Sequence, residues 1–313
     1  MSHHRRTDRL GVHSIGEFLM TVPSLQDAKA FYTAFGLHVE DEPDGLALRT
    51  HGDPHVWGRL RQGPRKKLER LTLHCFEDDL PALRRQAGAQ GVALLPPPDA
   101  ASDGLWMRSP DGMLLQVRAG AKTTLDAARH QGLPLPQDGT PCAPYRRHAP
   151  AVRPTRLSHI ALTTSSVPAQ VDFYLRVLGL RMSDHSGDGV AFLHAPHGGD
   201  HHLIALAGSA GPGLHHLSWD VPTVNDIGLG AMAMAAAGYK EGWGVGRHVL
   251  GSNYFYYVQD PWGSFCEYSA TMDYIPASAD WVGRDHSPED SFYLWGPDVP
   301  PAMFAYSEGG AWS

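Results

Sequence analysis

Alternating apolar and polar positions predict two similar sets of short strands and amphipathic helices along the chain. Segments 28–39 (AKAFYTAFGLHV) and 170–182 (QVDFYLRVLGLRM) both have the apolar spacing of an amphipathic helix. In each segment the helical pattern ends at a Gly-Leu pair, which begins at Gly36 or at Gly179, and glycine suits the end of a helix. Each also follows a strand-like run that ends in Val-Pro. We therefore predict that the chain contains two copies of one structural unit.

The same pairing continues further along each copy. Residues 70–92 parallel residues 215–239 as a strand followed by a helix. Residues 109–117 parallel residues 260–268 as a turn that leads into a strand. Each half therefore reads as a strand, a helix and two or three strands, followed by the same elements again. This pattern predicts an α+β fold of tandem modules.

A polar, proline-rich segment divides the two copies. Residues 133–156 have proline and polar residues in place of an apolar period, which is typical of a linker. We therefore expect an N-terminal domain over residues 1–132 and a C-terminal domain over residues 157–272. Residues 273–313 have no clear period but carry large apolar side chains that need burial. We expect this tail to close over a pocket mouth as a lid.

Composition excludes several classes of function. With 313 residues, 42% of them hydrophobic, the chain can bury a substantial core. Its net charge of −7 argues against a nucleic-acid partner. No segment approaches the roughly 20 apolar residues of a membrane span, and the N-terminus lacks the apolar stretch of a signal peptide. The absence of such a segment leads us to expect no membrane partner. The cysteines are few and widely spaced, without a CxxC pair, so we expect a cytoplasmic protein.

The repeat allows each half to serve as a control for the other. The second half offers His159, His216 and Glu267 on three predicted strands. Alignment of the corresponding segments, each taken separately, places opposite them, in order, Glu17, Leu71 and Gln116. Two imidazoles and one carboxylate are the donor set of a facial metal site that keeps open positions for substrate and oxygen. The sequence therefore predicts one metal site, in the second half only.

Two adjacent histidines leave the register of one ligand open. Side chains of neighbouring residues on a strand point to opposite faces, so only one of His215 and His216 can face the site. The register that groups His216 with Ser218 and Asp220 sends His215 to the other face. The pattern alone does not decide which face is the core.

The second half closely resembles the type I extradiol ring-cleavage dioxygenases of the vicinal oxygen chelate superfamily, in particular the homoprotocatechuate and catechol 2,3-dioxygenase branches. The resemblance is most specific over residues 246–267 (GRHVLGSNYFYYVQDPWGSFCE), which follow the signature Gly-x-His, apolar-Tyr, acidic-Pro-x-Gly and a terminal Glu. Tyr256 departs from it, because an aliphatic residue or Phe is usual there. The resemblance extends over nearly the whole chain. It implies tandem βαβββ modules, two per domain, with each domain a curved mixed sheet around a funnel and the N-terminal domain non-catalytic.

The resemblance also implies the roles of individual residues. In this family the second histidine of the pair is the ligand, which implies a metal site at His159, His216 and Glu267 and leaves His215 to pack beside it. His202 matches the acid–base histidine, although a one-residue slip of the loop would exchange it with His201.

The remaining implied site residues contact the substrate. His248 matches the histidine that hydrogen-bonds the substrate hydroxyl, and Tyr257 matches the tyrosine beside the ring. The residues expected to bind the ring or its substituents are Phe192, Asn253 and Trp295. Three other histidines are expected in surface loops, namely His185, His194 and His197.

The implied activity is insertion of O2 into a catechol-type ring next to its two hydroxyls at a non-haem Fe(II), although the same ligands accept Mn(II). The expected partners are a small aromatic diol and O2, and the expected assembly is a homo-oligomer, either a dimer or a tetramer. The homoprotocatechuate branch holds a substrate carboxylate with paired arginines, and residues 286–301 contain none. Arg284 lies nearby, but a catechol without an acidic side chain fits better.

Two other classes use the same scaffold. A glyoxalase-like isomerase or an epimerase usually has Glu in place of His216 or builds its site from both halves of the chain. A non-catalytic aromatic-binding protein of the bleomycin-resistance kind needs no metal ligands. An aerobic assay with ferrous iron and catechol separates the three classes.

Overall fold

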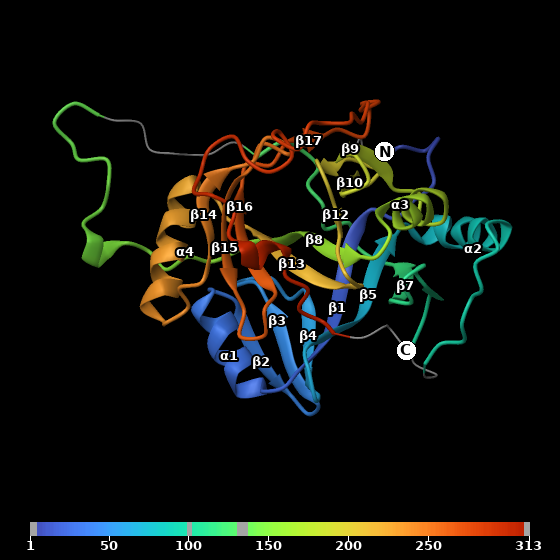
Figure 1. Cartoon of the computed structure of the whole chain (residues 1–313), viewed down its shortest axis with the longest axis horizontal. Helices are drawn as coiled ribbons and strands as arrows, with labels where there is room; N and C mark the ends of the chain where they lie inside the picture. Colours follow the sequence, from blue (N-terminus) through green and yellow to red (C-terminus); the bar gives the residue numbers. More distant parts are fainter. Residues whose placement is uncertain (1–4, 99–101, 130–136, 310–313) are drawn as a thin grey trace.

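Two mixed β-sheets form the body of the protein, one from each half of the chain (Figure 1). The computed structural model describes residues 5–98, 102–129 and 137–309, so the first residues of the predicted linker, 133–136, lie outside it. Within these residues, helices lie against the sheets, as expected for an α+β fold. None of the helices in the described part of the chain is long and apolar enough to cross a membrane.

The first sheet has seven strands in the order β2-β3-β4-β1-β5-β7-β6. Its first module is β1 (Ser14–Val22), α1 (Leu25–Ala34), β2 (His38–Glu42), β3 (Gly45–Arg49) and β4 (Gly58–Gln62). Its second module is β5 (Lys67–Cys75), η1 (Glu77–Asp79), α2 (Leu80–Ala89), β6 (Leu105–Arg108) and β7 (Leu114–Ala119). The leading strands β1 and β5 pair antiparallel at the middle of the sheet, so the two modules lie back to back.

The second sheet has eight strands in the order β14-β15-β16-β13-β8-β12-β10-β9. Its first module is β8 (Arg156–Thr164), α3 (Val167–Arg176), β9 (Arg181–Ser186), β10 (Val190–His194) and β12 (Ile204–Gly208). Its second is β13 (Gly213–Asp220), α4 (Val224–Ala236), β14 (Gly242–Arg247), β15 (Tyr254–Gln259) and β16 (Phe265–Ala270). The short elements η2 (Arg146–His148), β11 (Gly199–Asp200), β17 (Tyr274–Ile275) and η3 (Pro301–Phe304) lie in the connections and the tail.

Local sequence explains where these helices begin and end. Ser24 and Ser166 each accept a backbone hydrogen bond as the N-caps of α1 and α3. Thr223 begins α4 with a capping box. Gly36 and Gly179 have φ of 96° and 73°, the left-handed conformation that a residue without a side chain adopts readily after a helix. The predicted helix ends are therefore confirmed.

The observed strand register corrects one position of the internal alignment. Ser218 pairs with His159 and with Glu267, and Thr72 pairs with Glu17 and with Gln116 in the same pattern. The residue two positions before Thr72 therefore corresponds to His216, and that residue is Arg70 rather than Leu71. The error arose because a shift of one residue moves every side chain of a strand to the other face.

Arg70 gives the first sheet an ion pair where the second sheet has metal ligands. Its guanidinium donates to Glu17 Oε1 over 2.6 Å, and Arg59 donates to Glu17 Oε2 over 3.0 Å. Thr72 donates to Gln116 over 2.9 Å beside this pair. With an arginine and a glutamine in the corresponding positions, the first sheet does not offer the donor set of the second.

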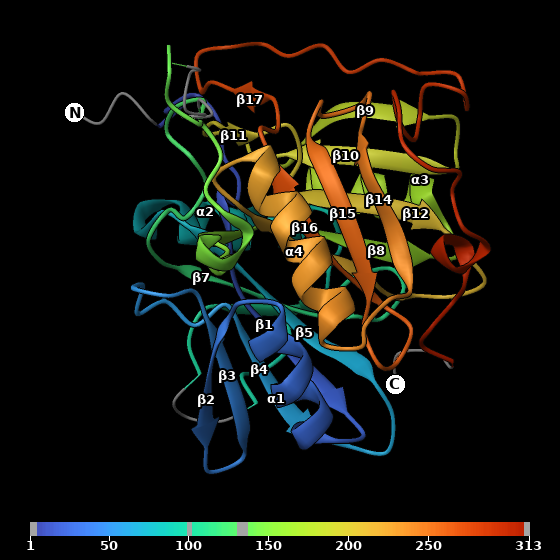
Figure 2. The same cartoon turned by 90° about the vertical axis from the view of Figure 1, so that its left-hand side faces the viewer.

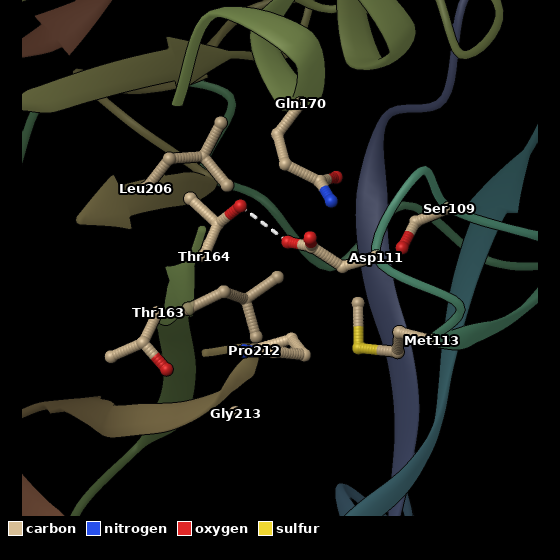
Figure 3. Close-up of a pocket in the computed structure, with 10 residues that line it drawn as sticks. Ser109, Asp111, Met113, Thr163, Thr164, Gln170, Leu206, Pro212 and Gly213 are labelled. Carbon is tan, nitrogen blue, oxygen red and sulfur yellow. Dashed lines mark hydrogen bonds between the residues drawn. The ribbon is translucent and has the colours of Figure 1, made fainter. Parts of the chain in front are cut away.

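Polar and aromatic contacts join the two halves. Figure 3 shows Asp111, in the turn between β6 and β7, hydrogen-bonded to Thr164 at the end of β8. Ser165 also donates to Asp111 over 2.9 Å. On another side, the rings of Phe35 and Tyr268 stack at 4.0 Å, and the Tyr268 hydroxyl donates to the Phe35 carbonyl. The two sheets therefore share one continuous core.

Two of the histidines expected on the surface are buried. His194 is 4% exposed and hydrogen-bonds Ser183, and burial lowers its pKa to about 3. His197 is fully buried near Asp79 of the first half, and burial lowers its pKa to about 4. The glycine and proline residues around them are typical of an exposed loop, but this loop packs between the halves. His185 is partly exposed, as expected, but it lies on β9 and not in a loop, and His194 is likewise the last residue of β10.

The tail is held to the body by a buried ion pair near its end. Figure 2 shows residues after β17 running along the rim of the second sheet before they reach η3. Glu308 is 4% exposed and accepts hydrogen bonds from the backbone N–H groups of Leu68 and Leu214. Lys66 lies 3.4 Å from its carboxylate and is equally buried. Glu308 therefore connects the tail to one central strand of each sheet.

We expect Glu308→Ala to reduce the free energy of unfolding by about 3 kcal/mol, because it leaves the Lys66 ammonium buried without its carboxylate. Chemical denaturation followed by circular dichroism measures this change. Glu69→Ala removes the partly exposed partner of Lys67 and is the matched control, with a loss below about 1 kcal/mol. Equal midpoints for the two variants would contradict the role of the buried pair.

Candidate metal centre and active site

Three side chains from three strands of the second sheet converge in its interior. His159 lies on β8, His216 on β13 and Glu267 on β16, and these strands are neighbours in the order β16-β13-β8. His159 Nε2 lies 3.1 Å from His216 Nε2 and 3.4 Å from Glu267 Oε2. His216 Nε2 lies 3.6 Å from the same carboxylate oxygen. The structure thus brings together the three residues predicted as ligands, all of them buried.

The donor set fits a divalent metal ion. Ligand atoms about 2.1 Å from an ion and at right angles to one another lie about 3 Å apart, close to these separations. Glu267 Oε2 is buried and has no hydrogen-bond donor, so a cation would satisfy it. Among the described residues, this is the one such group of histidine, cysteine and acidic side chains. Two imidazoles and a carboxylate form a non-haem metal site with open positions.

The protonation of these groups also suits metal binding. Burial lowers the pKa of His216 well below its usual value, and the neighbouring His215 and His159 lower it further. A neutral imidazole has a lone pair for a metal. Burial opposes ionisation of Glu267, but the neighbouring His159, His248 and Ser218 together favour the carboxylate and lower its pKa. The site therefore presents a neutral His216 and a carboxylate.

The two adjacent histidines on β13 contact each other, with their Nδ1 atoms 2.6 Å apart, but their Nε2 atoms have different partners. His216 turns Nε2 toward His159 and Glu267, whereas His215 donates from Nε2 to the Met303 carbonyl over 2.7 Å. His215 thereby connects the metal-ligand strand to the tail. The register that groups His216 with the site is the one observed.

A cavity of about 410 Å³ opens onto the three ligands. Its walls are mostly apolar and include Phe192 and Trp243 from the second sheet, Leu250 from the turn between β14 and β15, and Phe292, Met303 and Phe304 from the tail. No arginine or lysine is among the described residues that line it. Arg284 is exposed and lies outside this lining. The cavity therefore suits an uncharged, largely apolar ligand.

His202 lies in the wall of the cavity beside a predicted ligand. It follows β11, its ring centre is 4.1 Å from that of His159, and it is 3% exposed. Burial lowers the pKa of His202 well below its usual value, as do the neighbouring histidines. Its Nδ1 is 3.1 Å from His201 Nδ1, so Nε2 is the nitrogen left for the cavity.

His248 and Tyr257 form a hydrogen-bonded pair on the opposite wall. Nδ1 of His248 donates to the Phe292 carbonyl of the tail, which fixes its tautomer and leaves Nε2 as an acceptor. The Tyr257 hydroxyl donates to this Nε2 over 3.0 Å. Burial raises the pKa of Tyr257 well above its usual value, and Glu267 raises it further, so the hydroxyl keeps its proton.

The three predicted substrate-binding residues have different surroundings. Phe192 lines the cavity with its ring centre 4.9 Å from that of His202. Asn253 also lines it, but its amide nitrogen donates to Glu267 Oε1 and Ser269, so it orients the carboxylate. Trp295 is 45% exposed and is not part of the lining, which corrects its expected place. The tail contributes Phe292, Met303 and Phe304 instead.

Comparison with known proteins agrees with this geometry. Residues 156–268 match the family model of the glyoxalase/bleomycin resistance protein/dioxygenase superfamily. Metapyrocatechase 2 of Cupriavidus necator is 50% identical over 296 residues, which cover 93% of this chain and 91% of that relative. An iron-dependent extradiol dioxygenase of Rhodococcus jostii strain RHA1 is 26% identical over 160 residues, which cover 47% of this chain and 52% of that protein. The Mn(II)-bound glyoxalase from Novosphingobium aromaticivorans aligns with a TM-score of 0.76 and 26% identity, over 97% of this chain and 98% of that one.

The fold and the converging ligands define a protein of the vicinal oxygen chelate superfamily with a non-haem metal site. Within that superfamily, the chain belongs to the extradiol ring-cleavage dioxygenases. The family and the fold class predicted from the sequence are therefore confirmed. The roles of individual site residues stay predictions.

Proposed function

We propose that this protein cleaves catechols at the bond next to the two hydroxyls, with Fe(II) held by His159, His216 and Glu267. The observation that carries the proposal is the convergence of these three ligands on a cavity without positive charge. The 50% identity to a metapyrocatechase, an extradiol catechol dioxygenase, supports the reaction. Iron is supported by the iron-dependent relative, and metal analysis of the purified active protein distinguishes it from Mn(II).

The bound metal would supply Lewis acidity toward the two catechol oxygens and a redox path between the ring and O2. In our proposal, side chains of the protein transfer protons, orient the substrate and exclude water. His202 accepts a hydroxyl proton at Nε2 and later returns one, which suits a neutral, buried imidazole beside the ligands. His248 and Tyr257 orient the substrate hydroxyl through their shared hydrogen bond. The apolar walls, including Phe192, hold the ring and exclude water.

The cavity lining favours catechols with neutral substituents. We expect kcat/KM for catechol or 4-methylcatechol to exceed that for 3,4-dihydroxyphenylacetate by at least about 10-fold, because a buried carboxylate without a cation is costly. Oxygen uptake and the yellow ring-opened product measure both rates in one assay with ferrous iron. Preference for the acidic catechol would contradict this substrate class. No oxygen uptake with any catechol would contradict the proposed reaction itself.

A glyoxalase-like isomerase is the second candidate, because such a protein shares the fold at a TM-score of 0.76. It is less well supported, since all three ligands come from one half of the chain. An isomerase consumes no O2, so the oxygen-uptake assay separates the two.

We further propose a role for each domain and for the tail. Residues 157–272 form the catalytic, metal-binding domain. Residues 1–132 form a non-catalytic domain, which the linker 133–156 joins to it, and residues 273–313 cover the cavity as a lid. The tail residues in the cavity lining support the lid.

The exposed apolar side chains of the tail, including Val282 at 75% and Leu294 at 62%, support a homo-oligomer, a dimer or tetramer, which light scattering tests. The absence of disulfides among the described residues supports a cytoplasmic location, which cell fractionation tests.

A further inference from the structure

A buried carboxylate connects to His202 through a second histidine. Asp184, on β9, is 6% exposed, and its Oδ2 lies 2.8 Å from His201 Nε2. His201 is 1% exposed, and its other nitrogen, Nδ1, lies 3.1 Å from His202 Nδ1. The ring of Trp281 lies edge-on to His201 at 5.6 Å. The three side chains therefore form a continuous chain from a carboxylate to the wall of the cavity.

The hydrogen bonds determine where each proton lies. A carboxylate only accepts, so His201 donates to it from Nε2, and a ring that holds a single proton there has its lone pair on Nδ1. His202 must then donate from Nδ1 to His201, which leaves the lone pair of His202 on Nε2, toward the cavity. This is the same logic by which the acidic member of a catalytic triad fixes the tautomer of its histidine.

The other oxygen of Asp184 is already in use. Oδ1 accepts from the Arg284 backbone N–H over 3.0 Å and from His286 Nε2 over 2.8 Å. His286 is partly exposed in the tail, whereas His201 points inward. The two histidines on one carboxylate thus provide an internal control for each other.

We propose that Asp184 and His201 are positioning residues that fix the tautomer of His202, so that its unprotonated Nε2 faces the substrate. The inference rests on the proposed function, because it gives this tautomer a role in accepting a substrate proton. Neither residue is part of the cavity lining. Both act through His202.

Asp184→Asn tests the proposal with little change in shape. The Arg284 backbone N–H cannot reverse its direction, so it holds the new amide oxygen on its side and turns the NH2 group toward His201. His201 must then accept at Nε2 and donate from Nδ1, which moves the proton of His202 to Nε2. We expect kcat to fall by about 10- to 100-fold, the usual range for loss of a histidine's outer partner. Metal content and anaerobic catechol affinity should stay near wild type.

Two comparisons separate positioning from a structural role. His286→Phe removes the other histidine on Asp184 and should keep kcat within about threefold of wild type. In the His202→Phe background, Asp184→Asn should cause no further loss of kcat, because the residue it acts through is already gone.

Three results would overturn the inference in a protein that cleaves catechols: unchanged kcat in Asp184→Asn, an equal loss in His286→Phe, or an additive loss in the His202→Phe background. Because the wild-type protein is measured first, absence of ring cleavage there would overturn the proposed function and this inference with it. The two failures are therefore distinguishable.

Discussion

His216→Ala should lose its bound metal and its activity, whereas His215→Ala should keep most of its metal. The two residues are adjacent on β13, but only His216 turns a ring nitrogen toward His159 and Glu267. Removing one of three protein ligands leaves too few donors to hold a divalent ion against solvent. Metal analysis of the purified variants, expressed per chain, gives the answer directly.

The pair is a sharp comparison because both substitutions remove the same atoms from the same strand. His215→Ala loses the hydrogen bond to the Met303 carbonyl, so it should loosen the tail and weaken catechol binding without emptying the site. Circular dichroism should show that both variants are folded. Metal loss in His215→Ala with retention in His216→Ala would overturn the ligand assignment.

His202→Phe should keep its metal and bind catechol anaerobically with near wild-type affinity, yet turn over slowly. All three ligands remain and phenylalanine keeps an aromatic ring in the cavity wall, so we expect little change in binding. General acid–base help is typically worth about 10²–10⁴-fold in rate, and kcat should fall within that range. Steady-state oxygen uptake measures kcat, and titration under argon measures affinity.

His201→Phe is the matched control for the adjacent position. It removes the partner of His202 but not the residue that faces the cavity, so its loss should resemble the smaller loss of Asp184→Asn. If His202→Phe lost its metal, His202 would be a ligand. If it were fully active while His201→Phe was not, the proton-transfer role would belong to His201.

The metal ligands could be predicted from the sequence because the alternation of side chains along a strand and the comparison of the two halves leave few candidate residues. Three strands of the second half each bring one donor to the same face, and the first half has Glu17, Arg70 and Gln116 in the corresponding positions. The alignment chose Leu71 instead of Arg70 because both sheets have an irregularity one or two residues before this position, between Leu68 and Arg70 and between Leu214 and His216. Sequence spacing alone does not reveal such bulges.

The positions that the sequence missed depend on contacts between distant segments. Asp184 meets His201 from a different strand, and no local motif marks either residue. Trp295 was chosen for its size, but the path of the tail carries Phe292 and Met303 into the cavity and leaves Trp295 near Tyr254 at the surface. His197 was expected in solvent because its loop is polar, yet that loop packs against the first half. Such outcomes follow from tertiary packing, which composition does not specify.

The central claim is that this chain inserts both atoms of O2 into a catechol ring. Mass spectrometry of the product formed from 4-methylcatechol with the Fe(II)-loaded protein under 18O2 tests it most directly. The account predicts a ring-opened product heavier than the substrate by one O2 molecule, with label in both new oxygen positions when exchange with water is prevented. A product of unchanged mass, or one that contains a single labelled oxygen in an intact ring, would contradict it.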